Sequence, residues 1–137
     1  MIYTSYFAKL NKLPKNVFPV AICGKVPDWY TGARYTKLAP KYYLLLNWKY
    51  NHNDDEYAKR FCSTTLAHLD IDRVLTDLQM LMPDDIIRQM QSPVVRNPDW
   101  HIALICYEKP SDFCHRHLVR NWIKGHGYEC KEFGGEA

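Results

Sequence analysis

Along the chain, segments with the hydrophobic pattern of strands alternate with segments that have the pattern of helices, which predicts strands separated by helices. Residues 2–7 are rich in β-branched and aromatic side chains, and residues 17–23 form a compact apolar run that Gly24 stops. Both patterns are typical of strands. Residues 101–107 are almost continuously apolar, which indicates a strand covered on both faces of a parallel sheet. A last strand is predicted at 128–133.

Apolar residues at helical spacing predict the intervening helices. Pro40 suits the first turn of a short helix that continues through Leu46. The acidic segment 53–56 then supplies a cap and first-turn acids for a strong stripe that ends at Leu69. This stripe predicts one helix and places Cys62 on its core face.

Further helices are predicted on either side of the central strand. An apolar stripe over 71–82 ends at Pro83, and a weaker turn of helix follows over 84–90. After the central strand, Ser111 is predicted to cap a final helix whose apolar side includes Val119. Strands that alternate with helices predict a three-layer, Rossmann-like α/β fold with a small, mainly parallel sheet flanked by helices.

Length and composition favour one globular domain over residues 1–137. A chain of this length buries roughly two-thirds of its unfolded surface, so it needs no disulfide or metal to fold. Disordered and collagen-like proteins and small disulfide-rich scaffolds are therefore excluded.

The charge and cysteine patterns bear on location. The chain has 18 basic and 15 acidic residues, 47% hydrophobic residues, and no apolar run long enough for a membrane span. It also lacks the pattern of a signal peptide, and its five widely spaced cysteines fit a reducing compartment. We expect a cytoplasmic protein with no membrane partner.

The turn after the central strand contains the most reactive residue types. In open α/β sheets such turns bind ligands. Helical spacing points Cys114 and His115 inward at the rim of the sheet and leaves Arg116 at the boundary, able to swing over the rim. A thiol at a helix amino terminus near an imidazole and a guanidinium has a lowered pKa and acts as a nucleophile. Backbone N–H groups and Arg116 would hold an anion, and Glu108, on the face of Cys106, would act as a base.

Two other interpretations of this turn stay open. Cysteine is among the most buried residue types, so Cys106 and Cys114 also fit simple packing, with His117 facing solvent. The same residues suit zinc, with Cys106, Cys114, His115 and His117 as ligands, but the paired spacings of structural zinc sites are missing. We assign no metal and no cofactor from the sequence, and we expect Cys23 and Cys130 to be packing residues.

A second candidate site is the long loop that follows the second strand. Five basic residues and one acidic residue lie between 25 and 49, a local charge of +4. Basic side chains among aromatic ones neutralise phosphate and stack on bases, although aromatic residues also anchor loops to the body of a protein. Both loops leave carboxyl ends of strands, so we expect them to line one crevice. The candidate ligand-binding residues are Gly24, Lys25, Trp29, Tyr30, Arg34, Tyr35 and Lys37.

The segments 105–110 (Ile-Cys-Tyr-Glu-Lys-Pro) and 113–118 (Phe-Cys-His-Arg-His-Leu) together resemble a bacterial and phage family, domain of unknown function 488. The hallmark of this family is a strand, then the sequence Cys-x-Glu, and then a helix that starts with Cys-His-Arg. The similarity continues through residues 29–32, 38–40 and 56–57, and so covers most of the chain.

The resemblance implies an α/β fold and a site, but no reaction. The implied site consists of Cys106, Glu108, Cys114, His115 and Arg116, with the loop after the second strand. Many members carry an Asp and an Arg after that strand, where Cys23-Gly24-Lys25 stands here. The roles of that Asp and Arg therefore do not transfer to this chain.

Our first functional hypothesis is an enzyme or enzyme-like protein that binds a phosphorylated or nucleotide-related ligand between the two loops. The expected partner is an anionic or nucleotide-like small molecule. An alternative is a non-catalytic nucleotide- or nucleic-acid-binding protein related to phage or host defence. A third hypothesis is a zinc-stabilised structural domain.

Overall fold

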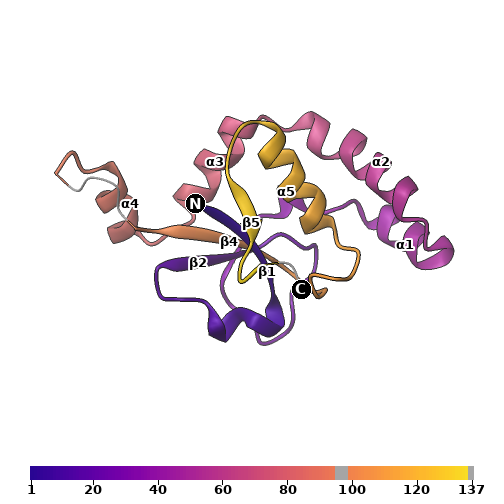
Figure 1. Ribbon diagram of the computed structural model, residues 1–137, viewed down its shortest axis with the longest axis horizontal. Helices are drawn as coiled ribbons and strands as arrows, with labels where there is room; N and C mark the ends of the chain where they lie inside the picture. Colours follow the sequence, from indigo (N-terminus) through magenta and orange to yellow (C-terminus); the bar gives the residue numbers. More distant parts are fainter. Residues whose placement is uncertain (95–98, 136–137) are drawn as a thin grey trace.

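The computed structural model of the chain describes residues 1–94 and 99–135. Its centre is a sheet in the order β3-β2-β4-β1-β5, in which every neighbouring pair is parallel (Figure 1). The predicted α/β fold with a mainly parallel sheet is confirmed. The strands are β1 (Ile2–Tyr6), β2 (Val17–Ala21), β3 (Ala33–Arg34), β4 (His101–Cys106) and β5 (Cys130–Glu132).

β4 is central, as its apolar sequence predicts. It lies between β1 and β2, and residues 102–106 are buried. The register sets Tyr6 opposite Cys106 and Ala21 opposite Ile105. The carboxyl ends of these three strands therefore meet at one edge of the sheet, where Cys106 is the last strand residue.

Helices and a loop cover the two faces of the sheet. Figure 1 shows the longer helices on one side and the 3-10 helix η1 (Phe7–Lys12) on the other. On the first side Phe61, Val74 and Ile123 pack with Leu104, and on the second Phe7 packs with residues of β2 and β4. The α-helices are α1 (Tyr42–Asn51), α2 (Asp54–Thr64), α3 (Ile71–Met80), α4 (Asp84–Gln91) and α5 (His115–Gly125). The 3-10 helices are η1 (Phe7–Lys12), η2 (Thr36–Leu38) and η3 (Leu66–His68). Within residues 1–94 and 99–135 no helix has the length and apolarity of a membrane span.

The helix predicted to run on to Leu69 ends at Thr64 instead. The Thr64 hydroxyl donates to the Arg60 carbonyl at 2.5 Å, and Thr65 leaves the helical conformation. Threonine side chains compete in this way with the helical backbone pattern. The prediction that Cys62 belongs to the core is wrong, because Cys62 is exposed.

Other boundaries also differ from the prediction. The first two strands are shorter than predicted, because Phe7 begins η1 and β2 ends at Ala21. The loop after β2 contains the short strand β3. A strand of two residues is too short to show an alternating pattern in the sequence. α5 begins at His115 rather than after a Ser111 cap, since its N-cap residue is Cys114, in an extended conformation.

A buried ion pair joins α5 to the sheet. Arg116 donates from Nε and Nη2 to the two carboxylate oxygens of Glu132 on β5, both at 3.1 Å. The Thr4 hydroxyl donates to the same carboxylate at 2.7 Å, and the guanidinium lies 5.5 Å from the centre of the Tyr6 ring. Arg116 is 0% exposed, so the prediction that it lies at the boundary and swings over the rim is wrong.

The ion pair yields a stability prediction. Glu132→Gln leaves the buried guanidinium without a counter-charge, and we expect a loss of about 3–5 kcal/mol in the free energy of unfolding. The comparison is Arg60→Gln, which removes an exposed pair with Glu56 and costs about 0.3–0.5 kcal/mol. Urea denaturation followed by circular dichroism measures both. Equal losses in the two variants would contradict a structural role for the buried pair.

Candidate functional site

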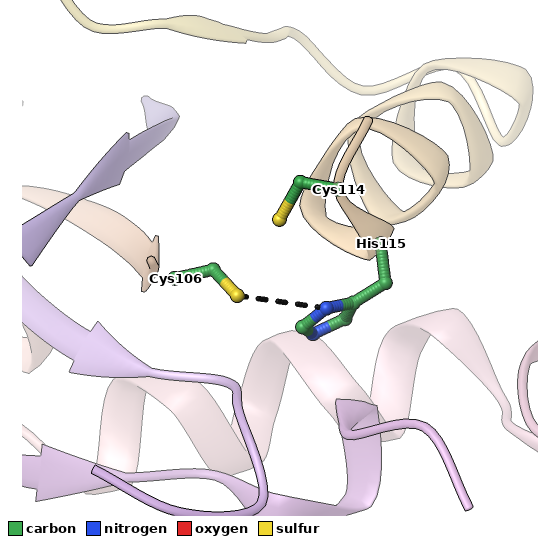
Figure 2. A group of neighbouring side chains, drawn as sticks. All are labelled: Cys106, Cys114 and His115. Atoms are coloured by element: carbon green, nitrogen blue, oxygen red, sulfur yellow. Dashed lines mark hydrogen bonds between the residues drawn. The ribbon is translucent and has the colours of Figure 1, made fainter. Parts of the chain in front are cut away.

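Three side chains converge where β4 ends and α5 begins. Cys106 is the last residue of β4, Cys114 is the N-cap of α5, and His115 is its first helical residue. Their ligand atoms all lie within 4.8 Å of one another, and all three residues are buried. Figure 2 shows the two sulfur atoms and the imidazole facing a common space, with 3.6 Å between Cys106 Sγ and His115 Nδ1.

The other ring nitrogen fixes the orientation of His115. Its Nε2 lies 2.8 Å from the carbonyl oxygen of Ile22, the residue that follows β2. A carbonyl only accepts hydrogen bonds, so Nε2 carries the hydrogen. Nδ1 is thereby the atom that faces the sulfurs and exchanges a proton with them. The Phe61 ring packs edge-on against the imidazole at 5.6 Å.

Cys114 is the most acidic thiol of the group. A hydrogen bond from Cys106 lowers the pKa of Cys114 to about 3 against the opposing effect of burial, and His115 and the backbone N–H of Arg116 contribute. The same hydrogen bond raises the pKa of Cys106, which keeps its proton. Cys114 at a helix start therefore carries the thiolate.

Cys23 is a third sulfur at this edge, which the sequence predicted as packing. Its pKa is lowered, first by a hydrogen bond from Cys106. Cys106 carries one S–H proton and stabilises one thiolate at a time, and only Cys114 has a hydrogen bond from the His115 side chain as well. In the sequence, the one sign that Cys23 belongs to the site is its position just after a strand. That it lies next to Cys106 becomes clear only from the pairing of β2 with β4.

Glu108 lies at the outer side of the sulfurs. Its carboxylate Oε2 is 3.9 Å from Cys106 Sγ, and its side chain is exposed. Partial desolvation, together with the negative charge on Cys114, raises the pKa of Glu108. A carboxyl group with a raised pKa next to a thiolate is suited to proton transfer.

Arg116 is held by the fold rather than directed toward solvent. Besides the two bonds to Glu132, its Nη1 donates to the Glu108 carbonyl oxygen at 2.5 Å. The guanidinium thus positions the backbone of Glu108 and the start of α5. This arrangement does not favour the predicted contact of Arg116 with an anionic ligand.

The two predicted loops meet at one point. The Tyr107 hydroxyl donates to the Lys25 carbonyl at 2.5 Å, and Arg34 Nη2 donates to the Gly24 carbonyl at 2.8 Å. The side chains of Lys25 and Arg34 are exposed, and Trp29 is 60% exposed. The exposed side chains of the loop after β2 therefore lie beside the segment that follows β4.

The other loop candidates are engaged elsewhere. The buried Tyr30 hydroxyl donates to the Ala33 carbonyl at 2.6 Å, which braces the loop. The Tyr35 hydroxyl donates to Asp77 of α3 at 2.7 Å, and Lys37 pairs with the same carboxylate at 3.7 Å. Tyr35 and Lys37 therefore fasten the chain to α3.

Two residues on the helical side complete the surroundings. Tyr57 of α2 is buried, and its pKa is raised by burial and by Cys114, Cys106 and Glu108. Its phenol therefore stays protonated near the sulfurs, a position that the sequence indicated only through the family resemblance. Among the described residues, His117 is not part of the sulfur and imidazole group, and its Nε2 lies 3.2 Å from the Asp112 carbonyl.

Comparison with known proteins yields one family. The model of DUF488-N3a, described as the active DUF488-N3 subclade, matches residues 6–127. No curated protein and no solved structure matches the chain. The match includes every residue of the sulfur and imidazole group.

The low pKa of Cys114 predicts an unusual pH profile of alkylation. With the exposed Cys62 replaced by alanine and EDTA present, the rate constant for iodoacetamide at Cys114 should be nearly equal at pH 6 and pH 8. The reason is that a thiol with a pKa of about 3 is ionised at both values. Peptide mapping by mass spectrometry measures the rate constant at each pH. Burial slows the reaction by the same factor at both pH values, so it does not change the ratio of the two rate constants.

Cys130 is the internal control for this measurement. Burial raises the pKa of Cys130 to about 11, so its rate should rise about tenfold per pH unit. A similar rise at Cys114 would show that its thiol is not ionised.

Proposed function

Because the chain belongs to the DUF488 family, in the subclade described as active, we propose that it is an enzyme in which Cys114 is the nucleophile. The observation that carries the proposal is the convergence of Cys106, Cys114 and His115 within 4.8 Å. A thiolate beside an imidazole whose second nitrogen is held by a backbone carbonyl is a recurring arrangement for covalent catalysis.

The residues take separate roles in the proposed reaction. In the resting site the proton lost by Cys114 lies on His115 Nδ1. The Cys114 thiolate forms a bond to the phosphorus atom of the substrate while the bond from phosphorus to the leaving oxygen breaks, and that oxygen takes the proton from Nδ1. Water then attacks the phosphorus of the cysteinyl intermediate, the bond from phosphorus to sulfur breaks, and Cys114 is released as a thiolate. Glu108 accepts the proton of the water and returns it to His115 Nδ1, which restores the site. Cys106 stabilises that thiolate by its S–H hydrogen bond.

The substrate class is a phosphorylated or nucleotide-related small molecule. Lys25 and Arg34 bring exposed positive charge to the loop that touches the segment after β4. Trp29 offers an exposed ring on which a base can stack. Arg116 acts as a positioning residue, because its guanidinium is occupied by Glu132 and the Glu108 carbonyl.

The proposed site requires the loops to part. Cys106 and Cys114 are each 3% exposed, whereas Glu108 above them is exposed. Movement of the segment 107–113 breaks the hydrogen bond from Tyr107 to the Lys25 carbonyl and admits the substrate. Local opening of this kind is common in enzymes that exclude water during reaction.

A second candidate is binding of nucleotides or nucleic acid without catalysis. It is favoured by the exposed Trp29, Lys25 and Arg34 and is independent of the sulfurs. In either case we propose a cytoplasmic location, which the odd number and wide spacing of the five cysteines support.

Two chromogenic phosphate esters test the enzyme proposal: p-nitrophenyl phosphate and the p-nitrophenyl ester of thymidine monophosphate. We expect hydrolysis of at least one, and a decrease of about 1000-fold in Cys114→Ala, since the nucleophile is removed. Cys62→Ala serves as the matched control and should keep the full rate, because Cys62 is exposed on α2. Rates that do not differ between the two variants would refute Cys114 as the nucleophile.

Binding of adenosine monophosphate tests the ligand class separately. Trp29→Ala should weaken the affinity about 5- to 100-fold, which corresponds to the loss of one stacked base. Tyr50→Ala is the control, since Tyr50 is 90% exposed on α1. Isothermal titration calorimetry measures both. If Trp29→Ala binds like Tyr50→Ala, the base does not stack on Trp29.

A further inference from the structure

The group at the end of β4 is also a set of metal ligands. We infer that a thiophilic divalent cation such as Zn²⁺ binds to Cys106, Cys114 and His115 and thereby blocks the nucleophile. The blocking rests on the proposed function, whereas the binding does not. Thiolate and imidazole are the ligand types that zinc prefers.

The distances suit a single ion. Zinc lies about 2.3 Å from sulfur and about 2.0 Å from nitrogen, so its tetrahedral ligands are about 3.5–3.8 Å apart. The Cys106 Sγ to His115 Nδ1 distance is already 3.6 Å, and no two of the three ligand atoms are more than 4.8 Å apart. In Figure 2 both sulfurs and the imidazole border the same space, so small side-chain adjustments bring all three to one ion.

The surroundings orient the imidazole as in known metal sites. Metal-bound histidines commonly donate their second N–H to a backbone carbonyl, which fixes the ring. Here His115 Nε2 donates to the Ile22 carbonyl at 2.8 Å, and Nδ1 points toward the sulfurs. The ligand nitrogen is therefore oriented before any ion arrives.

Charge also permits the ion to enter. Binding requires both cysteines as thiolates and Nδ1 of His115 without a proton, and the protons displaced from the group go to solvent. The positive charge of Arg116 lies nearby but is neutralised by the Glu132 carboxylate at 3.1 Å. The complex of Zn²⁺, two thiolates and a neutral imidazole carries no net charge, which suits a buried site.

The ligand set has an open position, unlike that of a structural zinc site. Structural sites have four protein ligands, and only three residues form this group among those described. His117, the fourth ligand considered from the sequence, contacts the Asp112 carbonyl instead. The packed cores on both faces of the sheet hold the fold without the ion. We therefore expect reversible binding rather than metal-dependent folding.

Cobalt substitution provides a direct measurement of binding. Titration of chelator-treated protein with Co²⁺ should give thiolate-to-cobalt charge-transfer absorption and intense tetrahedral bands that saturate at one ion per chain. Cys106→Ser and His115→Ala should each weaken binding at least about tenfold. The matched controls are Cys130→Ala, a buried thiol that does not belong to the group, and His117→Ala, a neighbouring imidazole. Both should bind like the unmodified protein, and circular dichroism confirms that all variants are folded.

The outcomes separate the two proposals. Zn²⁺ should slow iodoacetamide at Cys114 at least tenfold, and EDTA should restore the rate. Absence of the cobalt bands, or bands that persist in both Cys106→Ser and His115→Ala, would overturn the metal site while leaving the nucleophile intact. Bands that require both residues, in a protein whose Cys114 shows an ordinary alkaline pH profile when metal-free, would support the metal site and refute the proposed nucleophile.

Discussion

The buried ion pair between Arg116 and Glu132 determines where α5 begins, and the site depends on that position. An unpaired buried charge costs several kcal/mol, so α5 cannot slide or rotate without separating the guanidinium from its carboxylate. Cys114 and His115 directly precede Arg116, and Nη1 of Arg116 also holds the Glu108 carbonyl at 2.5 Å. One side chain thus sets the place of the proposed nucleophile Cys114, of the His115 imidazole and of the backbone of Glu108.

The chemistry of the site depends on which of its buried thiols keeps its proton. The thiols of Cys23, Cys106 and Cys114 lie at one strand edge, and Cys106 supplies the hydrogen bond that lowers the pKa of the other two. Burial alone would raise the pKa of Cys114, so its ionisation depends on donors that the fold aims at the sulfur. A hydrogen bond from His115 lowers the pKa of Cys114, whereas His115 acts on Cys23 only through its charge, and this difference favours Cys114 as the thiolate.

Local sequence patterns predicted the strand, the turn and the helix that carry the site, because these depend on apolar periodicity within one segment. They did not reveal the partners that make it work. The Ile22 carbonyl, Cys23 and Glu132 reach the site through the pairings of β2 with β4 and of β1 with β5, which join residues far apart in the chain. The predicted start of α5 is wrong. Serine is a residue type that commonly caps helices, which favoured Ser111, whereas the packing of the Arg116–Glu132 ion pair favours Cys114 as the cap.

Burial has opposite consequences for the two proposed roles of the sulfurs. It keeps Cys114 from water and large reagents until the segment 107–113 moves, so the rate of any reaction at the thiolate scales with the fraction of molecules that are open. A metal ion uses the same sulfur lone pairs and the same Nδ1, so the group can hold an ion or attack a substrate, but not both at once. Because Glu108 is exposed next to Cys106, it lies where an ion or a substrate would first meet the site. If both proposals hold, ion and substrate compete at this entrance, and the metal-free fraction of the protein sets how much of it is reactive.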